Sequence, residues 1–160
     1  MAGFRSAARR GRSRRSGVID AAEVARLVGE RMYGRDTAAQ SLGIGLVSIA
    51  PGEAVMRMAV GAQMVNAHRI CHGGFIFSLA DTAFAYACNS RDVIAVAQHC
   101  AITYLNSARC GDELMAIARE VALRGRSGVY DVRVAVGDLV VAEFRGHSRR
   151  LEGRHLDEPQ

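Results

Sequence analysis

The segment from residue 66 to residue 90 constrains the fold more than any other part of the sequence. Residues 75–88 are apolar at nearly every position, and no helix-breaking residue follows Gly74 within the segment. A helix that is apolar on all sides must be buried on all sides, because no face of it is suited to water. The sequence therefore predicts one long helix at the centre of the molecule.

Two features of this helix point to a chemical function. Asp81 carries the only formal charge between Arg69 and Arg91. A buried carboxylate needs partners, a raised pKa or a chemical role, because its burial is costly. The helix also opens with Gly73 and Gly74, which are poor helix formers but let an electron-rich group approach the free N–H groups of the first turn. Free donors and an acid about two turns further on predict a reaction site.

The size and composition of the chain fit one globular domain. Its 160 residues, 49% of them hydrophobic, can form a core but leave no room for a second domain. The four cysteines lack the paired spacing of metal ligands, so we expect free thiols in a cytoplasmic protein, with neither a metal ion nor a cofactor. No uncharged apolar run reaches the roughly 18 residues of a membrane span, because Asp81 interrupts the longest candidate.

The positive charge of the chain lies at its N-terminal end. The formal net charge is +5, all 21 basic residues are arginine, and six of these precede residue 18. The other 15 arginines face 16 acidic residues, which leaves the body at −1. We expect residues 1–17 to be a dispensable disordered arm, since such a composition cannot offset the entropy of ordering. Contact with nucleic acid or anionic lipid, a mitochondrial transit peptide and an upstream start codon are the alternatives. We expect neither nucleic acid nor membrane as a partner of the body.

The sequence before the central helix predicts a short helix and a hairpin. Asp20 and Glu23 have the spacing of a capping box, and apolar residues at helical intervals follow to about Tyr33. Residues 34–40 resemble a loop. Pro51-Gly52 then divides an apolar run into two strands of a hairpin.

The sequence after the central helix predicts four strands separated by short turns, at residues 93–105, 113–123, 129–136 and 139–144. Successive strands with short turns favour an antiparallel sheet. The predicted fold class is α+β, an antiparallel sheet wrapped around one long central helix. A single domain would cover residues 18–150, and a C-terminal tail residues 151–160.

The residues of the central segment also form a pattern, made of Asn66 and residues 72–74, 79–81 and 83–90, with further matching residues at 42–44, 128–132 and 144–148. This pattern resembles the signature of hotdog-fold acyl-CoA thioesterases, most closely the PaaI type associated with phenylacetate degradation. The resemblance spans roughly residues 33–150. It implies a homodimer with two active sites at the interface, and tetramers of two such dimers are common in the family. Asn66, His72 and Gly73 of one chain would then face Asp81 of the other.

The resemblance implies a role for each of these residues. Thioester hydrolysis develops negative charge on the carbonyl oxygen, which the N–H of Gly73, with Gly74 beside it, would stabilise. A side chain at either glycine would obstruct the thioester. Asp81 would act as a nucleophile that forms a mixed anhydride or as a general base for water. Asn66 would bind the water or the carbonyl, and His72 would orient the loop or polarise the carbonyl.

Each of these residues also has a structural alternative. Asp81 could be hydrogen-bonded to the backbone, His72 could cap the helix, Asn66 could form a turn, and the glycines could form a tight turn.

Some relatives place a Ser or Thr hydroxyl near the acid, on the strand after the helix. Residues 96–100 hold neither, so Gln98 or His99 would have to provide this support.

Coenzyme A carries phosphates, which arginine binds through two parallel hydrogen bonds. Two arginine-rich segments, residues 124–128 and 145–150, are expected to be loops that line its exit. The candidate substrate-binding residues are Gly74, Gln98, Arg124, Gly128, Arg145 and Arg149.

The predicted function is hydrolysis of phenylacetyl-CoA or a ring-hydroxylated relative. The alternatives are a thioesterase for other aromatic or medium-chain thioesters, including carrier-protein thioesters, and a non-catalytic acyl-CoA-binding module. A dehydratase of the same fold is disfavoured, because it would need a Glu near this helix. A nucleic-acid binder would act through the arm alone.

Overall fold

The part of the chain that the structure describes, residues 19–157 of a computed structural model, forms an antiparallel sheet with a long helix across one face. The predicted basic arm, residues 1–17, lies outside this range, as do residues 158–160. Within residues 19–157 no helix combines the length and the apolar character needed to cross a membrane.

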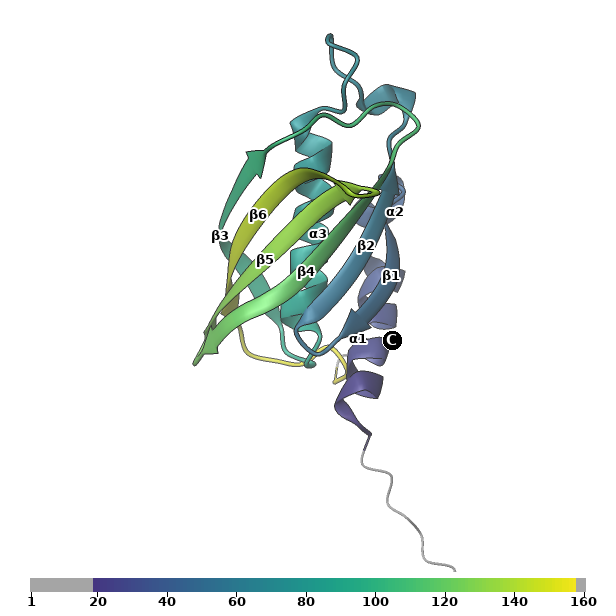
Figure 1. Ribbon diagram of the computed structural model, residues 1–160. Helices are drawn as coiled ribbons and strands as arrows, with labels where there is room; N and C mark the ends of the chain where they lie inside the picture. Colours follow the sequence, from purple (N-terminus) through teal and green to yellow (C-terminus); the bar gives the residue numbers. More distant parts are fainter. Residues whose placement is uncertain (1–18, 158–160) are drawn as a thin grey trace, which may run out of the picture.

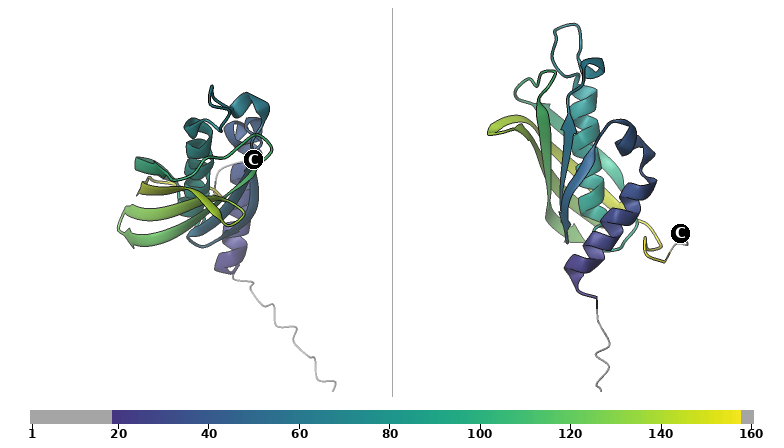
Figure 2. Two further views of the ribbon diagram at one scale, coloured as in Figure 1. Left: turned by 45° about the horizontal axis from the view of Figure 1, so that its top comes forward. Right: turned by 90° about the vertical axis from the view of Figure 1, so that its right-hand side faces the viewer.

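The elements in chain order are α1 (Ala21–Arg35), α2 (Thr37–Ser41), β1 (Gly45–Ala50), β2 (Glu53–Ala59), η1 (Ala62–Met64), α3 (Gly73–Asn89), β3 (Ala95–Tyr104), β4 (Glu113–Arg124), β5 (Ser127–Val136) and β6 (Leu139–Arg150). The strands are ordered β1-β2-β4-β5-β6-β3, and every neighbouring pair is antiparallel. The sheet curves across α3 (Figure 1), and α1 lies beside β1 on the same side of the sheet as α3 (Figure 2). The predicted fold class is confirmed.

Two predicted boundaries are wrong. Residues 34–40 are not a loop, because α1 continues to Arg35 and α2 starts at Thr37. Asp36 makes this possible by capping both helices: its N–H donates to the Tyr33 carbonyl, and its side chain accepts from the Ala39 N–H at 2.9 Å. Residues 145–150 are not a loop either, because they continue β6 and pair with both β5 and β3.

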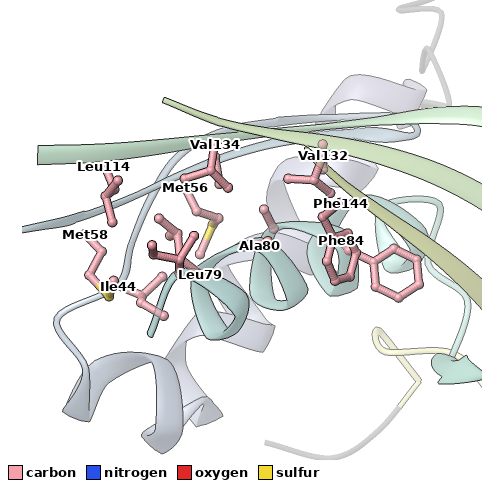
Figure 3. Close-up of a cluster of buried hydrophobic side chains, with 14 of the residues drawn as sticks. Ile44, Met56, Met58, Leu79, Ala80, Phe84, Leu114, Val132, Val134 and Phe144 are labelled. Atoms are coloured by element: carbon pink, nitrogen blue, oxygen red, sulfur yellow. The ribbon is translucent and has the colours of Figure 1, made fainter. Parts of the chain in front are cut away.

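The hydrophobic core lies between α3 and the concave face of the sheet (Figure 3). Leu79 and Ala80 on α3 point toward strand residues such as Met56 and Val134, all of them fully buried. Alternation along β2 and β5 supplies these residues, because every second side chain of a strand faces the same side. Gly146 on β6 leaves room for Phe84, whose ring would lie 2.9 Å from a Cβ at that position.

The helix α3 is not buried on every side, contrary to the expectation from its composition. Ser78, Asp81, Thr82 and Ala85 are only half-buried and recur at helical spacing along one side. No other element within residues 19–157 covers this stripe completely. An apolar helix with one uncovered stripe is suited to contact with another protein surface.

The C-terminal segment, residues 151–157, folds back onto the end of α3. Asp92, with 1% of its side chain exposed, accepts hydrogen bonds from the Arg154 guanidinium at 2.7 and 2.8 Å and from the Leu156 N–H at 2.9 Å. His155 Nε2 lies 2.7 Å from the side-chain oxygen of Asn89. These contacts join the turn between α3 and β3 to the end of the chain.

We expect Asp92→Ala to lower the free energy of unfolding by about 2 kcal/mol, because it leaves a part-buried N–H and an arginine without their acceptor. The matched control is Glu113→Ala, which removes an exposed ion pair with Arg57 and should change stability by less than about 0.5 kcal/mol. Urea unfolding monitored by circular dichroism measures both. Equal effects of the two substitutions would show that the C-terminal contacts do not stabilise the fold.

Candidate active site

The start of α3 combines a histidine cap with a free backbone donor. His72 is the N-cap residue, and its Nδ1 accepts a hydrogen bond from the Gly74 N–H at 3.0 Å. The Gly73 N–H has no acceptor among the residues that the structure describes. His72 therefore caps the helix, which is the structural alternative for this residue, and the free donor at this helix start is Gly73.

Gly73 also lies against the aromatic ring of Tyr104, a contact that the sequence did not predict. Tyr104, at the end of β3, donates its hydroxyl to the Gly73 carbonyl at 2.8 Å. A Cβ at Gly73 would lie 2.8 Å from Tyr104 Cζ, whereas a Cβ at Gly74 would meet only the His72 ring, with Nδ1 at 3.2 Å. The position of Tyr104 therefore explains why residue 73 is a glycine, independently of any need for a substrate to approach.

Asn66 shares a cavity with Gly73. Its side-chain oxygen accepts from the His68 N–H at 2.9 Å and from the Ile70 N–H at 3.4 Å, so it organises the loop that leads into α3. Its amide nitrogen has no acceptor within residues 19–157. The cavity has a volume of about 350 Å³ and is lined by Asn66, Ile70, Cys71, Gly73, Ile76, Tyr104, Leu105, Asn106 and Ser107.

Asp81 lies in the middle of α3, apart from that cavity. Its Oδ1 accepts a hydrogen bond from the thiol of Cys100 on β3 at 3.7 Å. Burial raises the pKa of Asp81, and the Cys100 hydrogen bond opposes this rise. Asp81 follows Gly73 by eight residues, which separates them by about 12 Å along the helix axis. Asp81 and the Gly73 N–H of one chain are therefore too far apart to contact the same substrate atom.

The residue beside Asp81 is Cys100, not Gln98 or His99 as expected. A β-bulge between Ala97 and His99 interrupts the pairing of β3 with β6. His99 faces away from α3 and contacts His147 with ring centroids 5.6 Å apart. Cys100, Ile102 and Tyr104 thereby face the helix. Simple alternation along the sequence could not reveal this, because the bulge shifts the phase of the strand.

Three of the candidate substrate-binding residues, Gln98, Arg124 and Gly128, line one cavity of about 580 Å³. His99 and His147 line it as well. Arg124 and Gly128 come from the two strands of the β4–β5 hairpin, and Gln98 comes from the bulge of β3. This cavity combines a cation, an amide and two imidazoles in one place, which suits an anionic ligand.

Arg145 and Arg149 do not line that cavity. Arg145 faces away from α3 and donates two hydrogen bonds of 2.7 Å to Asp131, which hold the pKa of that carboxyl below its usual range. Arg149 is exposed on β6. Within residues 19–157 no group of three or more His, Cys, Asp or Glu side chains is arranged to hold a metal ion.

Comparison with known proteins agrees with this architecture. The family model described as the thioesterase superfamily matches residues 68–143. Acyl-coenzyme A thioesterase PaaI of Escherichia coli (strain K12) is 48% identical over 123 residues, 76% of this chain and 88% of that protein. The structure of E. coli PaaI matches with a TM-score of 0.83 and 44% identity, over 84% of this chain and 99% of that one. The structure of smu.793 from Streptococcus mutans UA159 bound to acetyl CoA matches with a TM-score of 0.67 and 28% identity, over 69% and 90% of the two chains. The chain belongs to the thioesterase superfamily, within the hotdog-fold acyl-CoA thioesterases of the PaaI type.

Proposed function

We propose that this chain hydrolyses the CoA thioesters of aryl-acetyl groups, phenylacetyl-CoA or a ring-hydroxylated relative, to the free acid and CoA. The reaction takes place in a homodimer, at two equivalent sites that each combine Asp81 of one copy with Gly73 of the other. The observation that carries this proposal is the pair of half-sites on α3, a free N–H at its start and a half-buried carboxylate in its middle.

Gly73 supplies the donor for the oxyanion. Its N–H has no acceptor within residues 19–157 and lies at a helix N-terminus, where the helix dipole favours negative charge. The Gly74 N–H is occupied by His72, so Gly74 supports the turn and leaves donation to Gly73. The amide nitrogen of Asn66 borders the same cavity and is placed to donate a second hydrogen bond to the thioester carbonyl or to the attacking water.

The edge of the sheet indicates how two copies meet. β3 is one of the two edge strands, its ten residues include neither a charge nor a proline, and most of them are exposed. Native proteins often protect an unpaired edge with charges, and beyond the bulge at Gln98 the edge of β3 is uncharged and available to pair with another strand. A second copy pairing through β3 would also cover the half-buried stripe of α3.

The positions of two side chains on β3 define the register that this pairing needs. Along β3, Tyr104 lies beside Gly73 of α3, and Cys100 lies beside Asp81 of α3. An antiparallel pair with Cys100 opposite Tyr104 of the second copy therefore brings Gly73 of that copy to the level of Asp81. Both residues face the helices, as residues opposite each other must. In this dimer Asp81 acts as the nucleophile or as the general base for water.

The cavity lined by Gln98, Arg124 and Gly128 is the proposed contact for the phosphates of CoA. Gln98 lies in the bulge of β3, two residues before Cys100, so this cavity borders the edge strand that is proposed to pair with the second copy. Arg149 lies two residues beyond His147 on the same face of β6 and extends the cationic border. Arg145, which forms an ion pair with Asp131, contributes charge to the outer face of the sheet.

The proposed acyl group rests on two observations. Ile70, Ile76, Tyr104 and Leu105 line the cavity beside Gly73 and provide apolar and aromatic walls for a phenyl ring. The E. coli PaaI protein, to which the chain is similar, comes from the phenylacetic acid degradation operon.

Thiol release from a panel of thioesters tests the proposal. The panel contains phenylacetyl-CoA, hydroxyphenylacetyl-CoA, benzoyl-CoA and a medium-chain acyl-CoA, and a chromogenic thiol reagent measures free CoA. We expect the phenylacetyl compounds to have the highest kcat/KM. A higher value for the medium-chain thioester would support the alternative acyl group. Absence of release with CoA still bound would support a binding module.

A further inference from the structure

The Asp81 carboxylate has one hydrogen-bond partner in the described part of the chain. The Cys100 Sγ lies 3.7 Å from Asp81 Oδ1, a distance consistent with a thiol donor. No backbone N–H and no other side chain among residues 19–157 donates to this carboxylate. Any orientation that the chain imposes on Asp81 through hydrogen bonding therefore depends on Cys100.

The surroundings of Cys100 keep its thiol in place and protonated. Cys100 faces α3 because of the bulge in β3, and its neighbour across the sheet is Gly146, which has no side chain. Burial and the nearby Asp81 charge raise the pKa of Cys100 to about 11, so the sulfur carries its proton at neutral pH. The other thiol near this part of α3, Cys88, donates to the Ala85 carbonyl instead.

We propose that Cys100 is a positioning residue for thioester hydrolysis, whose S–H holds Oδ1 of Asp81 so that Oδ2 is directed at the substrate. This inference rests on the proposed function, because it assigns a role toward the reaction of Asp81. A carboxylate that rotates freely presents the reactive oxygen in the correct geometry only part of the time, and loss of alignment lowers the rate. A thiol is a weak donor, so the effect is smaller than loss of Asp81 itself.

The direction of the pH effect follows from the same contact. The hydrogen bond from Cys100 stabilises the ionised carboxylate and opposes the rise caused by burial. Without the hydrogen bond from Cys100, burial raises the pKa of Asp81 further. Because the reaction needs the ionised form of Asp81, the acid limb of kcat/KM moves to higher pH in Cys100→Ala.

The experiment compares Cys100→Ala and Cys100→Val, which lack a donor, with Cys100→Ser, which retains one. We expect kcat to fall about tenfold in the first two and to be largely restored in the third. Cys110→Ala removes an exposed thiol and serves as the control, with no change expected. Size-exclusion chromatography of each variant checks that β3 still forms the same assembly.

A second measurement does not depend on turnover. Carbon-13 NMR of protein with labelled aspartate follows the titration of the Asp81 carboxyl, which is assigned by its absence in Asp81→Asn. We expect the midpoint to rise in Cys100→Ala and Cys100→Val and to stay near that of the wild type, or below it, in Cys100→Ser. An unchanged midpoint in Cys100→Ala and Cys100→Val overturns the inference even if the enzyme is active. Wild-type protein that releases no thiol from any thioester refutes the proposed function, while the titration still decides whether Cys100 acts on Asp81.

Discussion

Replacement of Asp81 by asparagine is expected to lower kcat for thioester hydrolysis by about a hundredfold or more. An amide is neither a nucleophile nor a base, but it has nearly the same size as the carboxylate and leaves the packing of α3 unchanged. The control is Asp131→Asn, which changes an acid in an ion pair on the outer face of the sheet. Its kcat should stay within about twofold of the wild type, because neither Asp131 nor its partner Arg145 lines the cavity beside Gly73 or the cavity beside Gln98.

The pH dependence of the wild type provides a second measure of Asp81. Burial raises the pKa of this carboxyl above that of an unfolded aspartate. Activity that needs the ionised form is therefore lost as the pH falls through the raised value. An acid limb located at the ordinary pKa of aspartate, or equal rates in wild type and Asp81→Asn, would place the catalytic acid elsewhere.

The same shift has an effect on stability. Between the unfolded and the folded pKa of Asp81 the folded chain binds more protons, so stability decreases as the pH rises through this window. Asp81→Asn removes the buried charge and should raise the midpoint of thermal unfolding at neutral pH. The difference should vanish below the pKa of the unfolded carboxyl. A catalytic group that destabilises its own fold is expected at an active site.

The second large effect is expected for Gly73→Ala, with a loss of kcat of about a hundredfold. The added Cβ would lie 2.8 Å from the ring of Tyr104, so either the ring or the first turn of α3 must move, and the Gly73 N–H moves with it. Gly74→Ala is the matched control. Its Cβ would meet only the flexible His72 side chain at 3.2 Å, and we expect a much smaller loss.

Mixing the two inactive variants tests whether one site is built from two chains. A dimer of one Asp81→Asn chain and one Gly73→Ala chain contains one site with both substitutions and one site with neither. Co-refolding equal amounts should therefore restore about a quarter of the wild-type activity, because half of the dimers are mixed and each has one intact site. Sites built within single chains would remain inactive in every dimer, and no activity would return.

The sequence alone determined the elements of this fold and the segment that carries its chemistry. Residues 75–88 are apolar enough to predict a helix packed against the core, and the alternation around Tyr130 and Val132 is typical of a strand with one buried face. These signals are local, because hydrophobic periodicity and turn residues act within a few positions of the chain. The hotdog-type pattern at Asn66, His72 and Asp81 could be found for the same reason.

Tertiary structure alone decided which side chains meet. A single bulge at Gln98 turns Cys100 toward Asp81 and His99 away from it, and the pairing of Arg145 with Asp131 depends on the register of β5 against β6. The ring of Tyr104 reaches Gly73 from 31 residues away. Such contacts depend on the phase of each strand and on the order of strands in the sheet. A one-residue shift in strand register reverses the face of every side chain that follows. The composition of the sequence and the spacing of its residues do not predict such a shift.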